Sequence, residues 1–83
     1  MSNIYVIIDN KPIRLDPQKL KSIGINTYKH IYNFTYNGEN IYQARIPKYR
    51  ASLFSYDVLK CARFIDMVLI KHNKPPVNIL KLI

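Results

Sequence analysis

The middle of the chain carries side chains with cationic, amide and phenol groups, and such groups can form hydrogen bonds with a ligand. Arg45 and Arg50 carry guanidinium groups, Gln43 carries an amide and Tyr32 carries a phenol ring. In the DNA major groove, Arg forms paired hydrogen bonds with guanine and Gln can do the same with adenine. These residue types are therefore typical of a surface that contacts DNA bases.

Neighbouring polar side chains are suited to phosphate. Because Lys and Ser side chains hold phosphates and fix a protein on the duplex, we expect Lys29, Lys48 and Ser52 to contact the DNA backbone together with His30. The alternative is that these are solvated surface residues. Tyr32 can also stack on an unpaired base, which makes single-stranded nucleic acid the second ligand to consider. The predicted DNA-binding residues are Lys29, His30, Tyr32, Gln43, Arg45, Lys48, Arg50 and Ser52.

The charge and length of the chain agree with this interpretation. Thirteen Lys and Arg residues against five Asp and Glu residues give a formal net charge of +8, which attracts polyanions. The 83 residues have room for a single domain, and 48% hydrophobic residues favour a folded core. We therefore expect one small basic domain over residues 1–83.

Catalysis and metal binding are not favoured by the composition. The carboxylates are scattered, and no two of them are spaced for acid/base catalysis. One Cys and two His residues cannot form the usual tetrahedral zinc site, and two isolated glycines do not make a phosphate-binding loop. We expect a protein that is not an enzyme and needs no metal or cofactor.

The same features predict a compartment. Cys61 is the only cysteine, so an intramolecular disulfide cannot form, and this favours a reducing environment. The apolar run over residues 4–8 is too short for a signal peptide or a membrane span. We expect an intracellular protein, in the nucleus or cytoplasm, with no membrane association.

Two elements are predicted before residue 27, which we treat as an N-terminal extension. Residues 4–8 and 13–15 are rich in β-branched side chains and flank turn-forming residues, which predicts a short hairpin. Asp16 followed by Pro17 is typical of a helix start, and Gly24 of a helix end. A short helix over residues 17–23 is the prediction.

Asn37 and Gly38 predict the next hairpin, because a tight turn between two strands needs positive φ at both central residues. A second tight turn is expected at Pro47 and Lys48. The register that follows puts three polar pairs side by side: Tyr32 with Gln43, His30 with Arg45, and Arg45 with Arg50. One face of the resulting sheet is apolar and suited to the core, with Ile31, Tyr42, Ala44, Ile46, Tyr49, Ala51 and Leu53.

An amphipathic helix is predicted from the N-cap Asp57 through Asn73, ended by Pro75 and Pro76, after which residues 77–79 return along the sheet. The expected fold is α+β, with a three-stranded antiparallel sheet over residues 27–55 packed on one C-terminal helix and preceded by the short hairpin and the short helix. The helix carries more apolar surface than one stripe needs, so either the N-terminal hairpin or a partner chain is expected to cover it, and a homodimer is the simplest partner. The surplus residues are Leu59, Phe64, Met67 and Ile70.

Three strands followed by one helix, with polar side chains on the sheet face away from the helix, resemble the Apetala-two/ethylene-response-factor DNA-binding domain over residues 27–80. Residues 42–46 (Tyr-Gln-Ala-Arg-Ile) are similar to the second strand of that family, and residues 53–57 (Leu-Phe-Ser-Tyr-Asp) to its step into the helix. Asp66 and Asn78 match acidic and closing asparagine positions of the family. The resemblance implies binding of duplex DNA through the exposed sheet face.

The function expected from the sequence is nucleic-acid binding, with double-stranded DNA favoured over single-stranded nucleic acid, in a regulator of transcription or of the genome. The alternative is a small protein-interaction module that uses the apolar helix face and a surface rich in tyrosine. Seven tyrosines and a charge of +8 also suit an acidic protein partner. Competition by duplex DNA of random sequence discriminates between the two.

Overall fold

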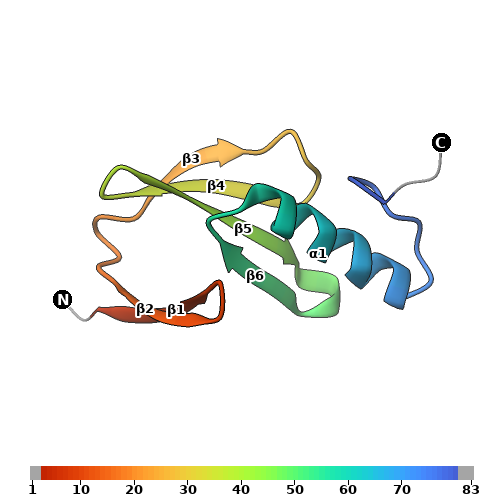
Figure 1. Cartoon of the computed structure of the whole chain (residues 1–83), viewed down its shortest axis with the longest axis horizontal. Coiled ribbons are helices and arrows are strands. Elements are labelled where there is room, and N and C mark those ends of the chain that lie inside the picture. The colour runs from red at the N-terminus through yellow and green to blue at the C-terminus, as the bar shows by residue number, and fades with distance from the viewer. Residues whose placement is uncertain (1–2, 81–83) are drawn as a thin grey trace.

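A computed structural model describes residues 3–80. Six short strands with alternating apolar residues form one sheet, and a single helix packs on one face of this sheet (Figure 1). The molecule is elongated, with extents of 45 × 21 × 20 Å. The elements in chain order are β1 (Ile4–Ile8), β2 (Lys11–Leu15), β3 (Lys21–Ile25), β4 (Ile31–Tyr36), β5 (Glu39–Ile46), the 3-10 helix η1 (Pro47–Tyr49), β6 (Ala51–Ser55) and α1 (Val58–Lys71).

The prediction of a three-stranded antiparallel sheet is wrong in both the number and the direction of the strands. The sheet has six strands in the order β2-β1-β6-β5-β4-β3, and it is mixed because β1 runs parallel to β6 through the pair Ile8 and Phe54. β4, β5 and β6 are neighbouring antiparallel strands within it. The N-terminal residues were predicted to lie outside the sheet, but they supply the remaining strands at both edges.

The first predicted register is confirmed. Asn37 and Gly38 have φ values of 51° and 83°, and the turn that they form pairs Tyr36 with Glu39 and Tyr32 with Gln43. Positive φ at both central residues makes a two-residue turn whose twist matches that of the strands.

The second predicted turn is wrong. Pro47 begins the one-turn helix η1, since its fixed φ suits a first helical residue, and the Arg50 N–H closes the turn on the Pro47 carbonyl at 3.0 Å. The connection is therefore two residues longer than expected. Ile46 pairs with Ala51, and Arg45 pairs with Ser52 instead of Arg50.

The short helix predicted over residues 17–23 is also absent. The Asp16 carboxylate accepts the Gln18 N–H at 3.0 Å, which is a helix-start contact, but only one turn follows before β3 begins. Gly24 adopts a φ of 115° at an irregularity in the pairing of β3 with β4, not at a helix end. Pairing with β4 outweighs the local helix signal in this segment.

The core between sheet and helix is built as the apolar pattern predicted. Its buried residues are Ile31, Ala44, Ile46, Cys61, Ala62, Ile65 and Leu69. The half-buried Tyr42, Tyr49 and Leu53 pack against this cluster. The N-cap of α1 is Asp57, whose carboxylate accepts the Leu59 N–H at 2.9 Å, as expected for this residue type.

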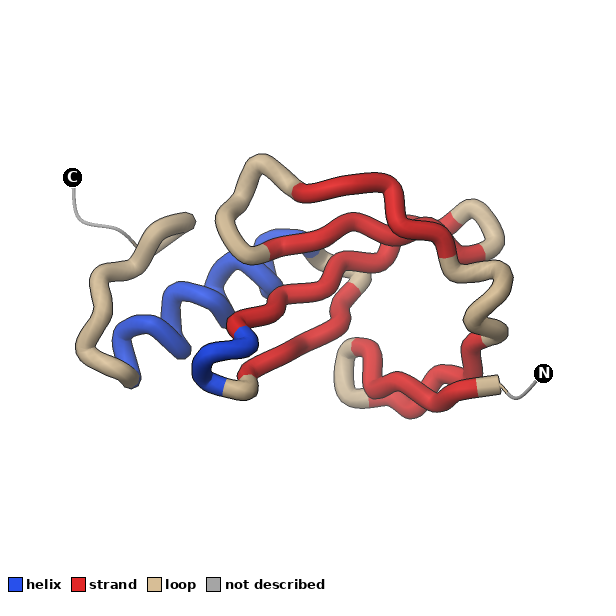
Figure 2. Tube along the Cα trace, turned by 180° about the vertical axis from the view of Figure 1, so that it is seen from behind, coloured by secondary structure: helices blue, strands red, loops and turns tan. Residues whose placement is uncertain are grey.

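A second apolar cluster lies on the opposite face of the sheet. Ile41 points away from α1 because it alternates with Tyr42 and Ala44, yet it is only 1% exposed, as are Ile8 and Leu15 of the β1–β2 hairpin. The hairpin is tied to this region by the Asp16 N–H, which donates to the Tyr36 hydroxyl at 3.0 Å. Figure 2 shows the β1–β2 hairpin beside the end of β6, and we infer from the burial of these three side chains that the hairpin packs against this end of the face.

Residues 77–79 do not return along the sheet as a strand, contrary to the prediction. Instead, the backbone N–H groups of residues 77–80 all donate to the carboxylate of Asp66 in α1, at 2.6–3.0 Å. This segment is therefore anchored to the helix by one side chain.

Candidate nucleic-acid interface

The predicted DNA-binding residues gather at one end of the sheet. β4 begins, β5 ends and β6 begins at this end, because neighbouring strands of the three are antiparallel. Tyr32 is the second residue of β4 and Ser52 the second of β6, while Arg45 is the last but one of β5. Lys29, His30, Lys48 and Arg50 lie in the connections that join these strand ends.

Four of these side chains share the sheet face that points away from α1. The register pairs Tyr32 with Gln43 and Arg45 with Ser52, so their side chains leave the sheet on the same side. Arg45 and Ser52 are exposed, and Tyr32 and Gln43 are half-buried. The β1–β2 hairpin borders this part of the face only on the β6 side, where Ser52 lines a cavity with residues 5–7 of β1.

His30 and Arg50 are placed differently from the prediction. His30 precedes β4 and has a φ of 65°, although its carbonyl still accepts the Arg45 N–H at 3.0 Å. Arg50 has a φ of 52° and ends η1. Both side chains are exposed, but neither is a strand residue opposite Arg45. The extra residues of η1 thereby remove the like-charge pair that the expected register would have created.

Lys29 is held by a contact that the sequence did not indicate. The Lys29 N–H donates to the Asn78 side-chain oxygen at 2.7 Å, and the Asn78 amide donates to the Lys29 carbonyl at 3.1 Å. The side-chain amide of Asn78 thus satisfies both backbone hydrogen-bonding groups of Lys29 in the β3–β4 connection. The Lys29 side chain is left free of this contact, in an exposed residue.

Asp66 of α1 holds residues 77–80 against the helix at this end of the molecule. It is completely buried, and burial alone would raise the pKa of its carboxyl, but four backbone N–H donors favour the charged form and hold the pKa below its ordinary value. The negative charge is therefore satisfied inside the protein and is not presented to a ligand. Sequence spacing contained a signal for this role, since Asp66 interrupts the apolar stripe of Ala62, Ile65 and Leu69.

Three further residues join this end without having been predicted. Tyr49 and His72 stack with ring centres 3.9 Å apart and planes inclined by 3°, which joins η1 to the end of α1. The Lys48 ammonium lies 5.8 Å from the centre of the Tyr49 ring. Lys74 lines the same cavity as Lys48 and Tyr49. These contacts depend on the path of the chain after the helix, which local sequence patterns do not reveal.

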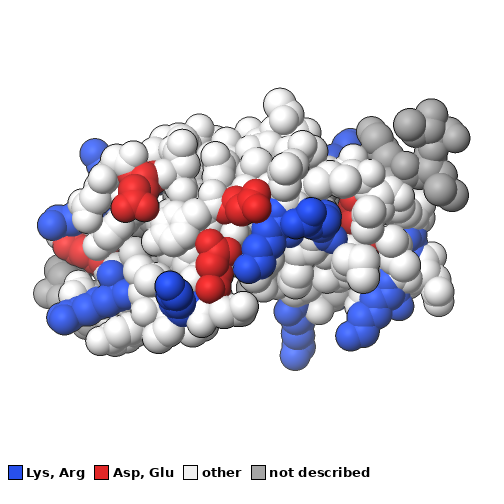
Figure 3. Space-filling model, viewed as in Figure 1, with Lys and Arg blue, Asp and Glu red and all other residues white. Residues whose placement is uncertain are grey.

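Charge is distributed unevenly along the molecule. We use the name basic end for the exposed residues at this end of the sheet: Lys29, His30, Arg45, Lys48, Arg50 and Lys74. The carboxylates other than Asp66 lie in the β1–β2 turn, after β2, at the start of β5 and at the N-cap of α1: Asp9, Asp16, Glu39 and Asp57. In Figure 3 the acidic atoms accordingly lie mainly over the left half and the centre.

Asp9 is neutralised locally. The Ser55 hydroxyl donates to its carboxylate at 2.5 Å and lowers the pKa of this group, to which the Tyr56 N–H and the Lys60 ammonium, at 3.2 Å each, contribute further. Lys60 is therefore engaged in an ion pair.

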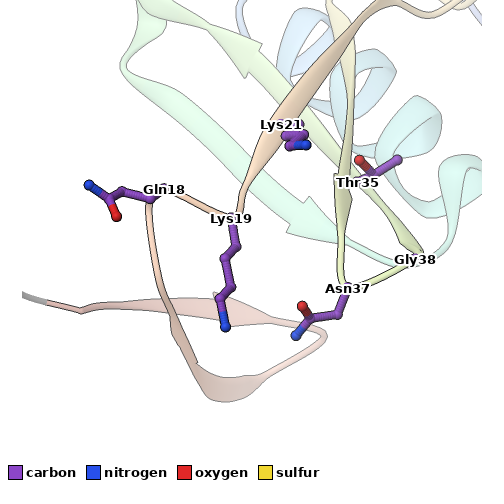
Figure 4. A pocket seen from close by; sticks show the side chains of 6 residues that line it. All are labelled: Gln18, Lys19, Lys21, Thr35, Asn37 and Gly38. Atoms are coloured by element: carbon purple, nitrogen blue, oxygen red, sulfur yellow. The ribbon is translucent and has the colours of Figure 1, made fainter.

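Two other cations lie at the opposite end of the sheet. Lys19 and Lys21 line a shallow cavity beside Thr35 and the Asn37–Gly38 turn, together with Gln18. Figure 4 shows these side chains pointing in different directions, with Gln18 turned away from the β4–β5 turn. Glu39 follows this turn directly, so the charge here is mixed. This cavity is less suited to a polyanion than the basic end.

Comparison of the chain with known protein families, with curated proteins and with solved structures finds no match. Within residues 3–80, no helix is long and apolar enough to cross a membrane. Over the same residues, no group of three or more His, Cys, Asp and Glu side chains is placed to hold a metal ion.

Proposed function

We propose that the protein binds nucleic acid, with double-stranded DNA as its ligand, through the basic end and the open part of the sheet face beside it. One observation carries the proposal. Exposed cations from three separate connections and from β5 converge at one end of the molecule, where the carboxylate of Asp66 is buried and saturated by backbone donors. A surface of this kind attracts phosphates and releases their counterions on binding.

The roles of the residues follow from where they lie. Arg45 projects from the open face with Gln43 and Ser52 as neighbours, so it is the candidate for contact with base edges. Lys29 and Lys48 lie in the connections around this face and are candidates for phosphate contacts. A role as a regulator of transcription or of the genome inside the cell is part of the same proposal.

Binding of a fluorescent duplex, measured by anisotropy at several salt concentrations, tests this proposal. We expect Arg45→Ala to weaken binding by about 1 to 3 kcal/mol and to relax the preference at one base position. Lys48→Ala should weaken binding to all sequences alike and reduce the salt slope by about one unit, because one phosphate contact is lost.

Lys19→Ala at the opposite end is the matched control, because it removes the same charge from an exposed residue outside the interface. It should leave affinity close to that of the parent. The proposal is wrong if the Arg45/Arg50 double alanine variant binds as tightly as the parent while charge reversal at Lys60, Arg63 and Lys71 abolishes binding. That result would assign the interface to the helix.

A second candidate function rests on the outer surface of α1. Met67 is 58% exposed and Ile70 44% exposed, and with Phe64 they line an apolar depression of about 360 Å³. The β1–β2 hairpin joins the sheet at the β6 edge, and the residues that line this depression all belong to α1. Exposed apolar surface favours an interface with a protein, either a second copy of this chain or another partner. Sedimentation of the parent and of Met67→Glu would reveal a dimer that the charge disrupts.

A further inference from the structure

A cavity of about 440 Å³ opens within the basic end, where η1, the end of α1 and residues 74–77 meet. Its deepest side chains are Ile46 and Leu69, which are buried, and the half-buried Tyr49 and Val77 form its sides. The exposed residues His30, Lys48 and Lys74 form its rim. The cavity therefore combines an apolar floor with a basic rim, and its size is in the range of small-ligand pockets.

The outer wall of this cavity is the segment of residues 74–77, which has no regular secondary structure but is fixed by hydrogen bonds. The Val77 N–H donates to the buried Asp66 carboxylate at 3.0 Å, and the next residue, Asn78, makes two hydrogen bonds to the backbone of Lys29. On the other side, the stack of Tyr49 on His72 fixes η1 against the end of the helix. A cavity with walls fixed in this way loses little conformational freedom when a ligand enters.

The chemistry of the lining selects the ligand. An apolar, flat group fits the floor of the cavity. An anion beside this group would face the three basic side chains of the rim, His30, Lys48 and Lys74, and none of the described lining residues is acidic. A nucleotide has both parts, because its base presents apolar faces and its phosphate is negative. The Lys48 ammonium near the Tyr49 ring is already placed beside the apolar part of the site.

We propose that this cavity receives an unpaired base, with the adjoining phosphates held by Lys48 and Lys74, so that the protein prefers a duplex that ends in a single-stranded extension. The inference rests on the proposed function and deepens it. Duplex binding positions the nucleic acid on the open sheet face, and the unpaired nucleotide enters the cavity at the neighbouring strand ends.

Three DNA ligands of equal duplex sequence test the proposal by anisotropy. One is blunt, one carries a short single-stranded extension, and one carries an extension of the same length made of abasic sites. The abasic extension keeps the phosphates and removes the bases. We expect the extension with bases to bind at least about fivefold more tightly than the abasic one, the lower end of the effect of base stacking.

Val77→Phe fills the cavity and should abolish this difference while binding of the blunt duplex is unchanged. The backbone contact from residue 77 to Asp66 does not involve the substituted side chain. Met67→Phe is the matched control, because it enlarges an exposed residue of α1 outside the cavity and should preserve the difference. If circular dichroism shows that Val77→Phe does not fold, the abasic comparison with the parent decides the question.

The outcomes separate the two proposals. If the parent binds none of the three ligands, the proposed function itself is wrong. If it binds the blunt duplex but the bases of the extension add nothing, or if both Phe variants lose the difference equally, the cavity is not a nucleotide site. Binding of polyglutamate that Val77→Phe abolishes, with no effect of the bases, would assign the cavity to an acidic peptide and overturn the inference.

Discussion

At the scale of single residues, Asp66 is the side chain that most determines the shape of the candidate interface. It is fully buried, and its two oxygens accept four backbone N–H groups from residues 77–80. An ion buried in this way is favourable only when its hydrogen bonds are complete. The C-terminal segment and the carboxylate therefore depend on each other.

Asp66→Ala leaves the backbone donors of this segment without their acceptor. We expect the free energy of unfolding, measured in urea, to fall by about 3 kcal/mol, because hydrogen bonds to charged groups are among the stronger ones. Asp57→Ala is the comparison, since it removes a carboxylate that caps α1 with one N–H contact, and it should lower stability by about 1 kcal/mol. Equal effects of the two substitutions would contradict the role assigned to Asp66.

Low pH should destabilise the protein through protonation of Asp66. The pKa of Asp66 is lower in the folded protein than its ordinary value of 3.8, so its contribution to stability is complete above that value and is lost as the pH falls through the folded-state pKa. We expect stability to decline as the pH is lowered below about 4, and to decline less steeply in Asp66→Asn. Asp9 shifts in the same direction, so the slope will be reduced and not removed.

Residue types alone were sufficient to predict some of these positions. Asn37 and Gly38 fixed the first hairpin because both residues tolerate positive φ. Arg50 could not be placed in this way, since a left-handed φ of 52° is unusual for Arg and follows from the closing of η1. The position of Asp66 in the apolar stripe of α1 indicated its burial, but its hydrogen-bond donors could not be derived, because they come from residues that have no regular secondary structure.

At the scale of elements, the β1–β2 hairpin decides which part of the sheet is accessible. Ile8 and Leu15 are 1% exposed although they lie outside the cluster beneath α1. Ile41, on the sheet face away from the helix, is buried to the same degree. The hairpin thus makes a second small core with one end of the sheet and leaves Arg45, at the other end, exposed.

Leu15→Ala tests whether the hairpin is a packed part of the fold. We expect a loss of about 2 to 5 kcal/mol in the free energy of unfolding, as for other buried large-to-small substitutions. Ile7→Ala in the paired strand is the control, because Ile7 is 58% exposed and should change stability by no more than about 0.5 kcal/mol. A hairpin that does not pack on the sheet would make the two substitutions equally mild.

Elements differ in how far local sequence determines them. The start of α1 was predicted correctly because its N-cap and apolar spacing agree with each other, but the helix ends at Lys71 and not at Asn73, which has a φ of 60°. Residues 17–23 carried helix-start and helix-end signals, but a strand at residues 21–25 gains hydrogen bonds from β4 that a short isolated helix would not. Pairing between strands distant in sequence is the information that local patterns lack.

At the scale of the whole molecule, the protein is an elongated body whose two ends differ in charge. The carboxylates accompany the cations near the β1–β2 hairpin and the start of α1, whereas exposed cations prevail where the helix ends (Figure 3). A molecule of this kind should approach DNA with the basic end first, and its association should slow as added salt screens the charges.

Heteronuclear NMR of the backbone amides during titration with duplex DNA locates the nucleic-acid interface, because every described element is observed at once. We expect signals from residues 29–32 and 43–52 and from Lys74 to shift together, while those of Lys19, Lys21 and the Asn37–Gly38 turn stay in place. Shifts confined to the outer surface of α1 around Phe64 and Met67, or to the opposite end of the sheet, would contradict it.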